Sequence, residues 1–206
     1  MTASKLVLNA ASGAAGGSGP SMENIFSTHL YTGNSSANRS INNGIDLSTD
    51  GGLVWIKGRS SGYDHVLEDT ERGADKALLT NTNGAAQSSG FYGVNQFNSN
   101  GFRLDESGNV NNSGIDYCSW TFKKQEKFFD IVTYTGDGNS SKTINHDLDT
   151  TVGMLIVKCT SNAQYWHVLH RSGSNSKTLY LNRTDAETND VNAWSSTSPT
   201  STQFTV

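Results

Sequence analysis

The sequence predicts an all-β protein built from two tandem antiparallel β-sandwich modules. Its apolar runs are short and rich in Val, Ile, Thr, Tyr, Phe and Trp, and they are separated by turn-forming pairs such as Asn43-Gly44 and Asp137-Gly138. Only two prolines occur in 206 residues, and no run has a convincing helical period. In addition, several segments recur about a hundred residues further along the chain.

Three strand-like segments of the first half recur in the second half. LVWIK at 53–57 returns as MLIVK at 154–158, YDHVL at 63–67 as YWHVL at 165–169, and KALLTN at 76–81 as KTLYLN at 177–182. Solenoid and propeller units have periods of about 20–50 residues. The longer period here therefore predicts that each copy is a domain rather than a stacking unit.

The chain divides into a flexible N-terminal arm with a Gly-rich linker at 1–21, a first module at 22–125 and a second module at 126–206. The closing strand of the first module has no counterpart in the second, because Phe204 aligns with Phe102 near the end of the chain. We therefore expect the second module to be C-terminally incomplete, as in a fragment of a longer protein. An exposed strand edge should remain there unless a partner covers it.

Alternating apolar residues and turn pairs predict the individual strands. In the first module they cover 25–32, 38–41, 52–58, 63–69, 77–81, 95–98, 101–104 and 115–123. In the second they cover 128–135, 141–144, 152–159, 164–170, 177–182, 191–194 and 202–206. The core of the first module is predicted to contain Trp55, Leu67, Phe102 and Trp120. The repeat also predicts that His167 superposes on His65 as a structural histidine.

Composition excludes several classes of partner. Charged residues make up 17% of the chain and the net charge is −4, so no basic surface for nucleic acid is expected. No run approaches the roughly 18 apolar residues of a membrane-spanning helix, so no membrane insertion is expected. The two cysteines, Cys118 and Cys159, do not occupy equivalent positions of the repeat, and we predict that both are free thiols.

The acidic segment 68–71 (EDTE) is the main candidate for catalysis, because sandwich folds host glycosidases that use two facing carboxylates. The second module has HRSG at the aligned positions 170–173, so we favour a solvated strand end. No metal-ligand spacing occurs. A calcium site at Asp46 or Asp137 is the alternative to turn formation by these residues. We predict no enzyme activity, cofactor or metal.

Two further sets of residues are candidates for binding. Tyr92, Trp166 and Trp194 are candidate glycan-binding residues, because aromatic rings in loops and late strands can stack on sugars, but for each of them we favour packing in the core. In the arm, the apolar piece Lys5-Leu6-Val7-Leu8 is predicted to anchor the protein to another protein, by adding to a sheet or filling a groove.

A set of motifs resembles a known family. They are GGLVWIKGR at 51–59, DTERGA at 69–74, FNSNGF at 97–102, NNSG at 111–114 before Trp120, and YTGDG at 134–138 with LIVK at 155–158. Together they resemble the repeated concanavalin-A-like lectin-type modules, of jelly-roll topology, in virion proteins of tailed phages from marine and cyanobacterial hosts. The second module departs from the pattern, since it lacks Asp-Thr-x-Arg-Gly and the closing Trp strand.

The resemblance implies a non-enzymatic structural or adhesive protein on the tail or surface of a phage particle. It would be a tail-fibre protein, attached to other virion proteins through its N-terminal arm and involved in attachment to the host surface. A homo-oligomer, with a trimer favoured, and a host-surface glycan as ligand are further expectations. The alternatives are a capsid decoration or head-fibre protein and a carbohydrate-active enzyme.

Overall fold

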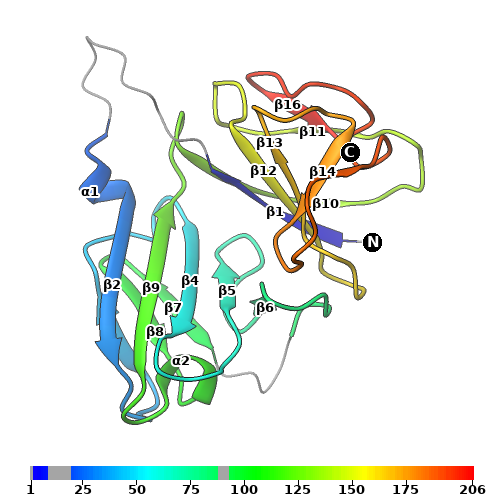
Figure 1. Ribbon diagram of the computed structural model, residues 1–206. Coiled ribbons are helices and arrows are strands. Elements are labelled where there is room, and N and C mark those ends of the chain that lie inside the picture. Colours follow the sequence, from blue (N-terminus) through cyan, green and yellow to red (C-terminus); the bar gives the residue numbers. More distant parts are fainter. Residues whose placement is uncertain (1, 9–19, 88–92) are drawn as a thin grey trace. The chain divides into compact units, whose positions relative to one another are not determined.

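The computed structural model describes residues 2–8, 20–87 and 93–206 (Figure 1). The predicted all-β class is confirmed: the described regular structure is antiparallel β except for two helices of four residues each. The chain forms two compact units. One contains residues 16–80 and 86–124 and is called the first module below. The other contains residues 1–15, 81–85 and 125–206 and is called the second module.

The first module has a five-stranded and a three-stranded sheet. The larger sheet has the order β2 (Phe26–Thr32), β9 (Asp116–Lys123), β4 (Gly52–Gly58), β5 (Val66–Asp69) and β6 (Leu78–Leu79). The smaller has the order β3 (Arg39–Asn42), β8 (Gly101–Leu104) and β7 (Val94–Asn98). Helix α1 (Met22–Ile25) precedes β2, and α2 (Gly108–Asn111) precedes β9.

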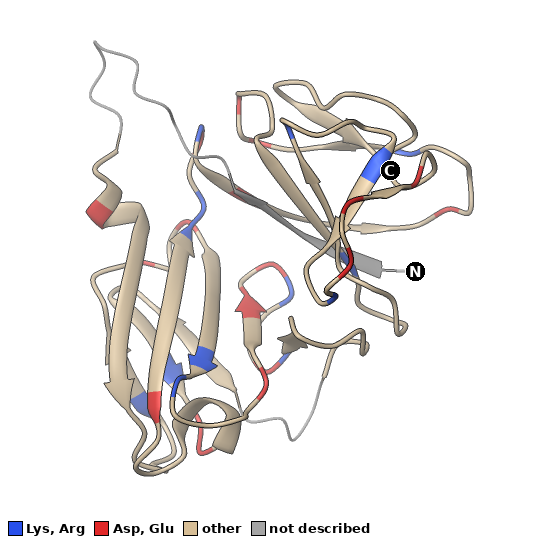
Figure 2. Ribbon diagram, in the orientation of Figure 1, with Lys and Arg blue, Asp and Glu red and all other residues tan. Residues whose placement is uncertain are grey.

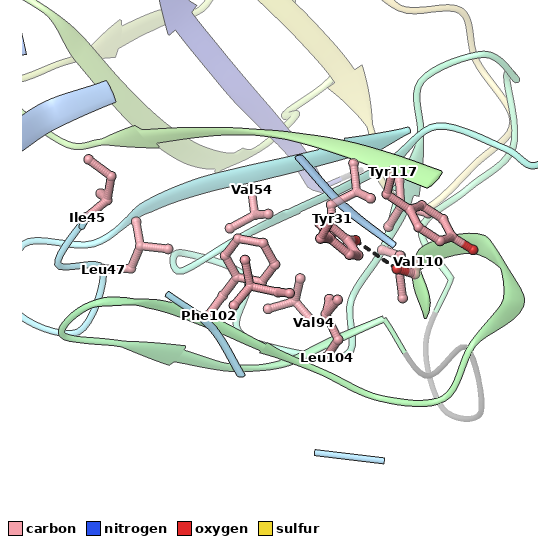
Figure 3. Close-up of a cluster of buried hydrophobic side chains, with 13 residues drawn as sticks. Tyr31, Ile45, Leu47, Val54, Val94, Phe102, Leu104, Val110 and Tyr117 are labelled. Atoms are coloured by element: carbon pink, nitrogen blue, oxygen red, sulfur yellow. Dashed lines mark hydrogen bonds between the residues drawn. The ribbon is translucent and has the colours of Figure 1, made fainter. Parts of the chain in front are cut away.

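Side chains from both sheets of the first module form one buried cluster (Figure 3). It includes Val54 and Tyr117 of the larger sheet and Val94, Phe102 and Leu104 of the smaller. Each of these five residues is completely buried. The module is therefore a β-sandwich in which the apolar face of each sheet is buried against the other.

Of the four predicted core residues of the first module, three lie outside the central cluster. Leu67 is buried, at 3% exposed, but it pairs with Trp55 and is not part of that cluster. Phe102 is in the central cluster, but Trp55 and Trp120 pair across β4 and β9 on the opposite face of the sheet, where they are only half-buried. Their rings meet edge-on at 5.9 Å. The central face of β9 instead carries buried Ser119 and Thr121. Thr121 can be buried there because its hydroxyl accepts a hydrogen bond of 2.8 Å from the Asn43 side chain.

The second module has a six-stranded and a two-stranded sheet. The larger sheet has the order β10 (Phe129–Thr135), β1 (Thr2–Leu8), β12 (Met154–Cys159), β13 (His167–His170), β14 (Lys177–Tyr180) and β15 (Thr188–Asn189). The smaller pairs β11 (Thr143–Asn145) with β16 (Gln203–Thr205). The predicted strand at 191–194 is wrong, because these residues form turns around the buried Trp194.

Strand β1 occupies the place in the second module that β9 occupies in the first (Figure 1). In the first module Phe122 pairs with Phe26 on one side and Leu53 on the other. In the second, Leu8 pairs in the same way with Phe129 and Met154. All of these pairings are antiparallel. β1 therefore has the same position in its sheet as β9 and runs in the same direction relative to its two neighbours.

This replacement corrects two expectations. The second module does not leave an open strand edge between β10 and β12, because β1 pairs with both strands. The arm residues Lys5, Leu6, Val7 and Leu8 are part of that sheet rather than a free segment. Removing them would break two ladders of main-chain hydrogen bonds, so the arm cannot be deleted without disturbing the second module.

The strand registers also correct the predicted superposition of the two histidines. Ile56 pairs with Val66 in the first module, and Val157 pairs with His167 in the second. Both strands are thus offset by 101 residues, which places His167 over Val66 and Trp166 over His65. The sequence motif YxHVL recurs at an offset of 102 residues, which predicted a register that differs by one residue from the observed one. A difference of one residue exchanges the two faces of a strand.

Candidate functional site

The candidate site is a hollow of about 270 Å³ in the second module. It lies where β10 and β12 end and β13 begins, between the loops at 136–142 and 160–166. Tyr134, Val157 and His167 line it from the strands, and the loops add Asp137 and Tyr165. Ligand pockets commonly have volumes of about 300–1,000 Å³, so this hollow has room for one small group such as a single sugar ring.

Tyr165 belongs to the lining of the hollow, and Tyr180 and Arg183 pack against its ring. Tyr165 is 39% exposed, and its ring meets that of Tyr180 edge-on at 5.5 Å. The Arg183 guanidinium carbon lies 4.5 Å from the centre of the Tyr165 ring and 5.1 Å from that of Tyr180. These contacts hold Tyr165 in place, so its exposed surface is preorganised for contact with a ligand.

Polar side chains also line the hollow. The Asp137 carboxylate accepts a hydrogen bond of 3.1 Å from the backbone N–H of Asn139, which lowers the pKa of Asp137, and Lys142 lies 3.4 Å away. Asn139, Lys142 and Gln164 also line the hollow. An ionised carboxylate, two amides and an ammonium group can together accept from and donate to the hydroxyl groups of a ligand.

Two rings deeper in the hollow are partly buried and uncharged at neutral pH. Burial lowers the pKa of His167 and raises the pKa of Tyr134 to about 12. The His167 ring meets Tyr180 edge-on at 5.0 Å. Its Nδ1 is buried with no hydrogen-bond partner among the described residues. The unmade bond costs free energy in the folded state.

The same end of the first module is filled by its own residues (Figure 3). Tyr31, which corresponds to Tyr134, donates a hydrogen bond of 2.7 Å to the carbonyl of Val110 in α2 and stacks on Tyr117 at 5.2 Å. In the second module the register position of Tyr117 belongs to Ala3. No counterpart of α2 occurs among the described residues of the second module. The hollow is therefore a feature of the second module.

The predicted glycan-binding tryptophans do not lie at this surface. Trp166 is 2% exposed and its indole N–H donates to the carbonyl of Thr82. Trp194 is 1% exposed and donates to the carbonyl of Lys177. Both are core residues with satisfied N–H groups, so neither has a free ring face for a sugar. Tyr92 lies outside the described residues.

The acidic segment of the first module has a structural role, and the expectation of a solvated strand end is wrong. Glu68 and Asp69 are 0% and 1% exposed. Glu68 accepts hydrogen bonds from the backbone N–H groups of Lys76 and Val94 at 3.2 and 2.7 Å. Asp69 pairs with the Arg72 side chain at 2.6 Å. These bonds anchor neighbouring loops and leave both carboxylates inaccessible to a substrate.

The two candidate calcium ligands serve as turn formers. Asp46 accepts from the backbone and hydroxyl groups of Ser48 and from those of Thr49, which lowers its pKa to about 2. Asp137 closes the turn at Asn139. Among the described residues, no three His, Cys, Asp or Glu side chains gather in a way that could hold a metal ion. No helix in the described ranges is long and apolar enough to cross a membrane.

Sequence reasoning missed Tyr134, Tyr165 and His167 as members of one site. Tyr134 lies in the motif YTGDG, whose first three residues also occur at 31–33, and Tyr165 and His167 lie in the repeated YxHVL motif. Each motif also occurs in the first module, where the corresponding end of the sandwich is filled. The useful clue would have been the missing counterpart of residues 105–115, since these residues fill that end in the first module.

Charge is spread over both modules, with Lys and Arg interspersed among Asp and Glu (Figure 2). Comparison with curated proteins gives no match, and comparison with solved structures gives none either. A family described as a domain of unknown function, DUF7483, matches residues 21–206. This match contains the strands of both modules except β1. The chain therefore belongs to the DUF7483 family.

Proposed function

We propose that this protein is a non-enzymatic structural and adhesive component of a phage virion that attaches to the host surface. In this proposal it is a tail-fibre protein and a homo-oligomer, with a trimer favoured. The second module carries the adhesive site, and the ligand is a host-surface glycan. The observation that carries the proposal is the hollow that is lined by the exposed, braced Tyr165 and by Asp137.

The chemistry of the hollow suits a neutral or weakly polar sugar. A sugar ring has an apolar face that can lie on the Tyr165 ring and hydroxyl groups that can bond to Asp137 and Gln164. Asp137 and Lys142 have opposite charges and lie 3.4 Å apart, so the pair does not select strongly for a charged ligand. The position of Glu68 and Asp69 in structural hydrogen bonds supports binding rather than glycoside hydrolysis.

Replacement of Tyr165 by Ala tests the proposed glycan site. We expect binding to an array of bacterial surface glycans to fall at least tenfold, because the exposed ring face is lost while the fold is kept. The matched control is Leu30→Ala, which removes an apolar side chain that is 57% exposed on the first module. Equal binding by wild type and Tyr165→Ala would rule out this hollow as the glycan site.

A capsid decoration or head-fibre protein is the alternative. Both assignments predict a virion protein, so the particle itself must distinguish them. Gold-labelled antibodies against the protein should mark the tail of the particle if it is a tail-fibre protein. Label confined to the head would replace the tail-fibre assignment with the alternative, and particles without label would contradict a virion role.

A further inference from the structure

The strand that closes the second module comes from the N-terminal end of the chain, whereas the strand that closes the first module follows the other strands of that module in sequence. In the first module, the strand between β2 and β4 is β9, which follows β8 in sequence. In the second module, the strand between β10 and β12 is β1, which precedes the first module in sequence. The family match at residues 21–206 contains both strands that flank this place, but not the strand that fills it.

The chain order around β1 repeats the chain order around β9. β9 closes the first module and leads, through residues 124–128, into β10, the first strand of the next module. β1 likewise closes a module and leads, through residues 9–25, into β2, which is the first strand of the first module. In both cases a closing strand is followed by the opening strand of a different module.

We propose that β1 of one copy closes the second module of another copy, so that copies join head to tail. With this connection, the chain passes from the second module of one copy into the first module of the next. Within one copy, the chain likewise passes from the closing strand of the first module, β9, into the opening strand of the second, β10. The proposed partner is therefore a second copy of this chain, and its binding element is residues 2–8.

The energetics allow this exchange. A strand donated by another copy makes the same main-chain hydrogen bonds to β10 and β12 as a strand from its own chain, so exchange changes few contacts. Eleven residues separate Leu8 from Pro20. At about 3.3–3.6 Å per residue, they can span at most roughly 36–40 Å. This length is the upper limit on the distance from Leu8 to Pro20 when β1 pairs with another copy.

The pairing register provides a direct test through a native cysteine. Ala3 pairs with Cys159 across β1 and β12, and both cysteines of the chain are free. Directly opposed residues on neighbouring antiparallel strands have Cα atoms about 4.5–5.5 Å apart, which suits a disulfide. A donor chain carries Ala3→Cys and Cys159→Ser, and the wild-type chain serves as acceptor. A disulfide between position 3 and Cys159 can then form only between two chains.

The two chains are refolded together, oxidised and separated on a non-reducing gel. We expect a covalent donor–acceptor dimer that disappears on reduction. Two controls should give no dimer: an acceptor with Cys159→Ser, and a donor with Ser4→Cys in place of Ala3→Cys, since Ser4 pairs with Lys158. The single variant Ala3→Cys, which retains Cys159, should form chains of cross-linked copies.

Two results would overturn the proposal. The first is that the Ala3→Cys variant forms only a disulfide within one chain and that donor and acceptor form no covalent dimer. The other comes from light scattering on the unmodified chain, which needs no substitution. We expect a mass of two or more copies, and the mass of a single copy at every concentration would show that each chain closes its own second module.

Discussion

At the scale of single residues, the two copies of the repeat use the same lysine for the same purpose. Lys57 donates to the carbonyls of Ser61 and Tyr63, at 3.2 and 2.8 Å. Lys158, which is completely buried, donates to the carbonyls of Asn83, Cys159 and Gln164 at 2.8–3.1 Å. In each copy, an ammonium group near the end of a central strand donates hydrogen bonds to loop carbonyl groups. Without the lysine, these carbonyl groups would need water as their hydrogen-bond partner.

Glu68 is expected to make stability depend on pH. Burial raises its pKa to about 7 from 4.5, so the folded state holds the proton more tightly than the unfolded state. Its contribution is therefore present below about pH 4.5 and is lost as the pH rises towards 7. We expect a loss on the order of 3 kcal/mol across this window, since one pKa unit corresponds to about 1.4 kcal/mol.

Glu68→Gln provides the comparison, because the amide does not titrate. Urea unfolding of both proteins at several pH values between 4.5 and 7 should show that the wild type loses stability relative to the variant as the pH rises. Contributions from other carboxyl groups cancel in this difference. Parallel stability curves for the two proteins would show that Glu68 does not titrate in this range.

At the scale of elements, β1 shows that a strand's position in the sheet is separable from its position in the chain. It is antiparallel to both β10 and β12 and pairs with them over seven and six residues. Every backbone N–H of a central strand faces one neighbour or the other, so the strand is bonded on both sides. Its main-chain bonds alone make it an essential part of the second module.

Leu6→Pro tests this role without reference to any side-chain contact. Proline removes a backbone N–H and is poorly tolerated in central strands. We expect the second module to lose on the order of 2–3 kcal/mol of stability. In hydrogen exchange, protection should fall in 129–135 and 154–159 but remain in 26–32 and 116–123.

The matched control is Ala186→Pro, which places proline at an exposed loop position of the second module and should leave exchange unchanged. Equal protection of β10 and β12 in Leu6→Pro and wild type would mean that β1 is not a central strand of this sheet.

At the scale of the whole molecule, the two modules follow one arrangement with different chain connections. The larger sheets have equivalent orders, β2-β9-β4-β5-β6 and β10-β1-β12-β13-β14, and the smaller sheets share the pairs Ile41–Phe102 and Ile144–Phe204. In the first module, residues 105–115 connect β8 to β9 and include α2. The second module has the hollow at the corresponding end and receives its closing strand from residues 2–8.

A circular permutant tests this equivalence. The permuted chain starts at Ser21 and continues to Val206, followed by an eleven-residue Gly/Ser connector and residues 2–8. The connector matches the eleven residues between Leu104 and Asp116. We expect the permutant to fold with a closed second module and to be monomeric, because the closing strand now follows β16 as β9 follows β8. Circular dichroism melting and light scattering measure both outcomes, and an unfolded second module would contradict the equivalence.

The sequence alone determined the class of the fold and most strand positions, because these depend on local patterns. Alternation and turn pairs predicted the bounds of β4 and β12 to within two residues of the observed ones. The repeat matched Lys57 with Lys158 and Phe102 with Phe204, and the registers bear out both matches. These features are encoded within short segments, so they can be recognised before any long-range contact is known.

Only the tertiary structure decided which face of each strand is central and which strand closes the second module. Alternation in β9 separates Trp120 from Ser119 and Thr121 but does not say which set faces the other sheet. The apolar run at residues 6–8 does not specify a partner, since a short strand can pair with any open edge. Its place is set by the gap between β10 and β12, and these strands lie more than a hundred residues away in the chain.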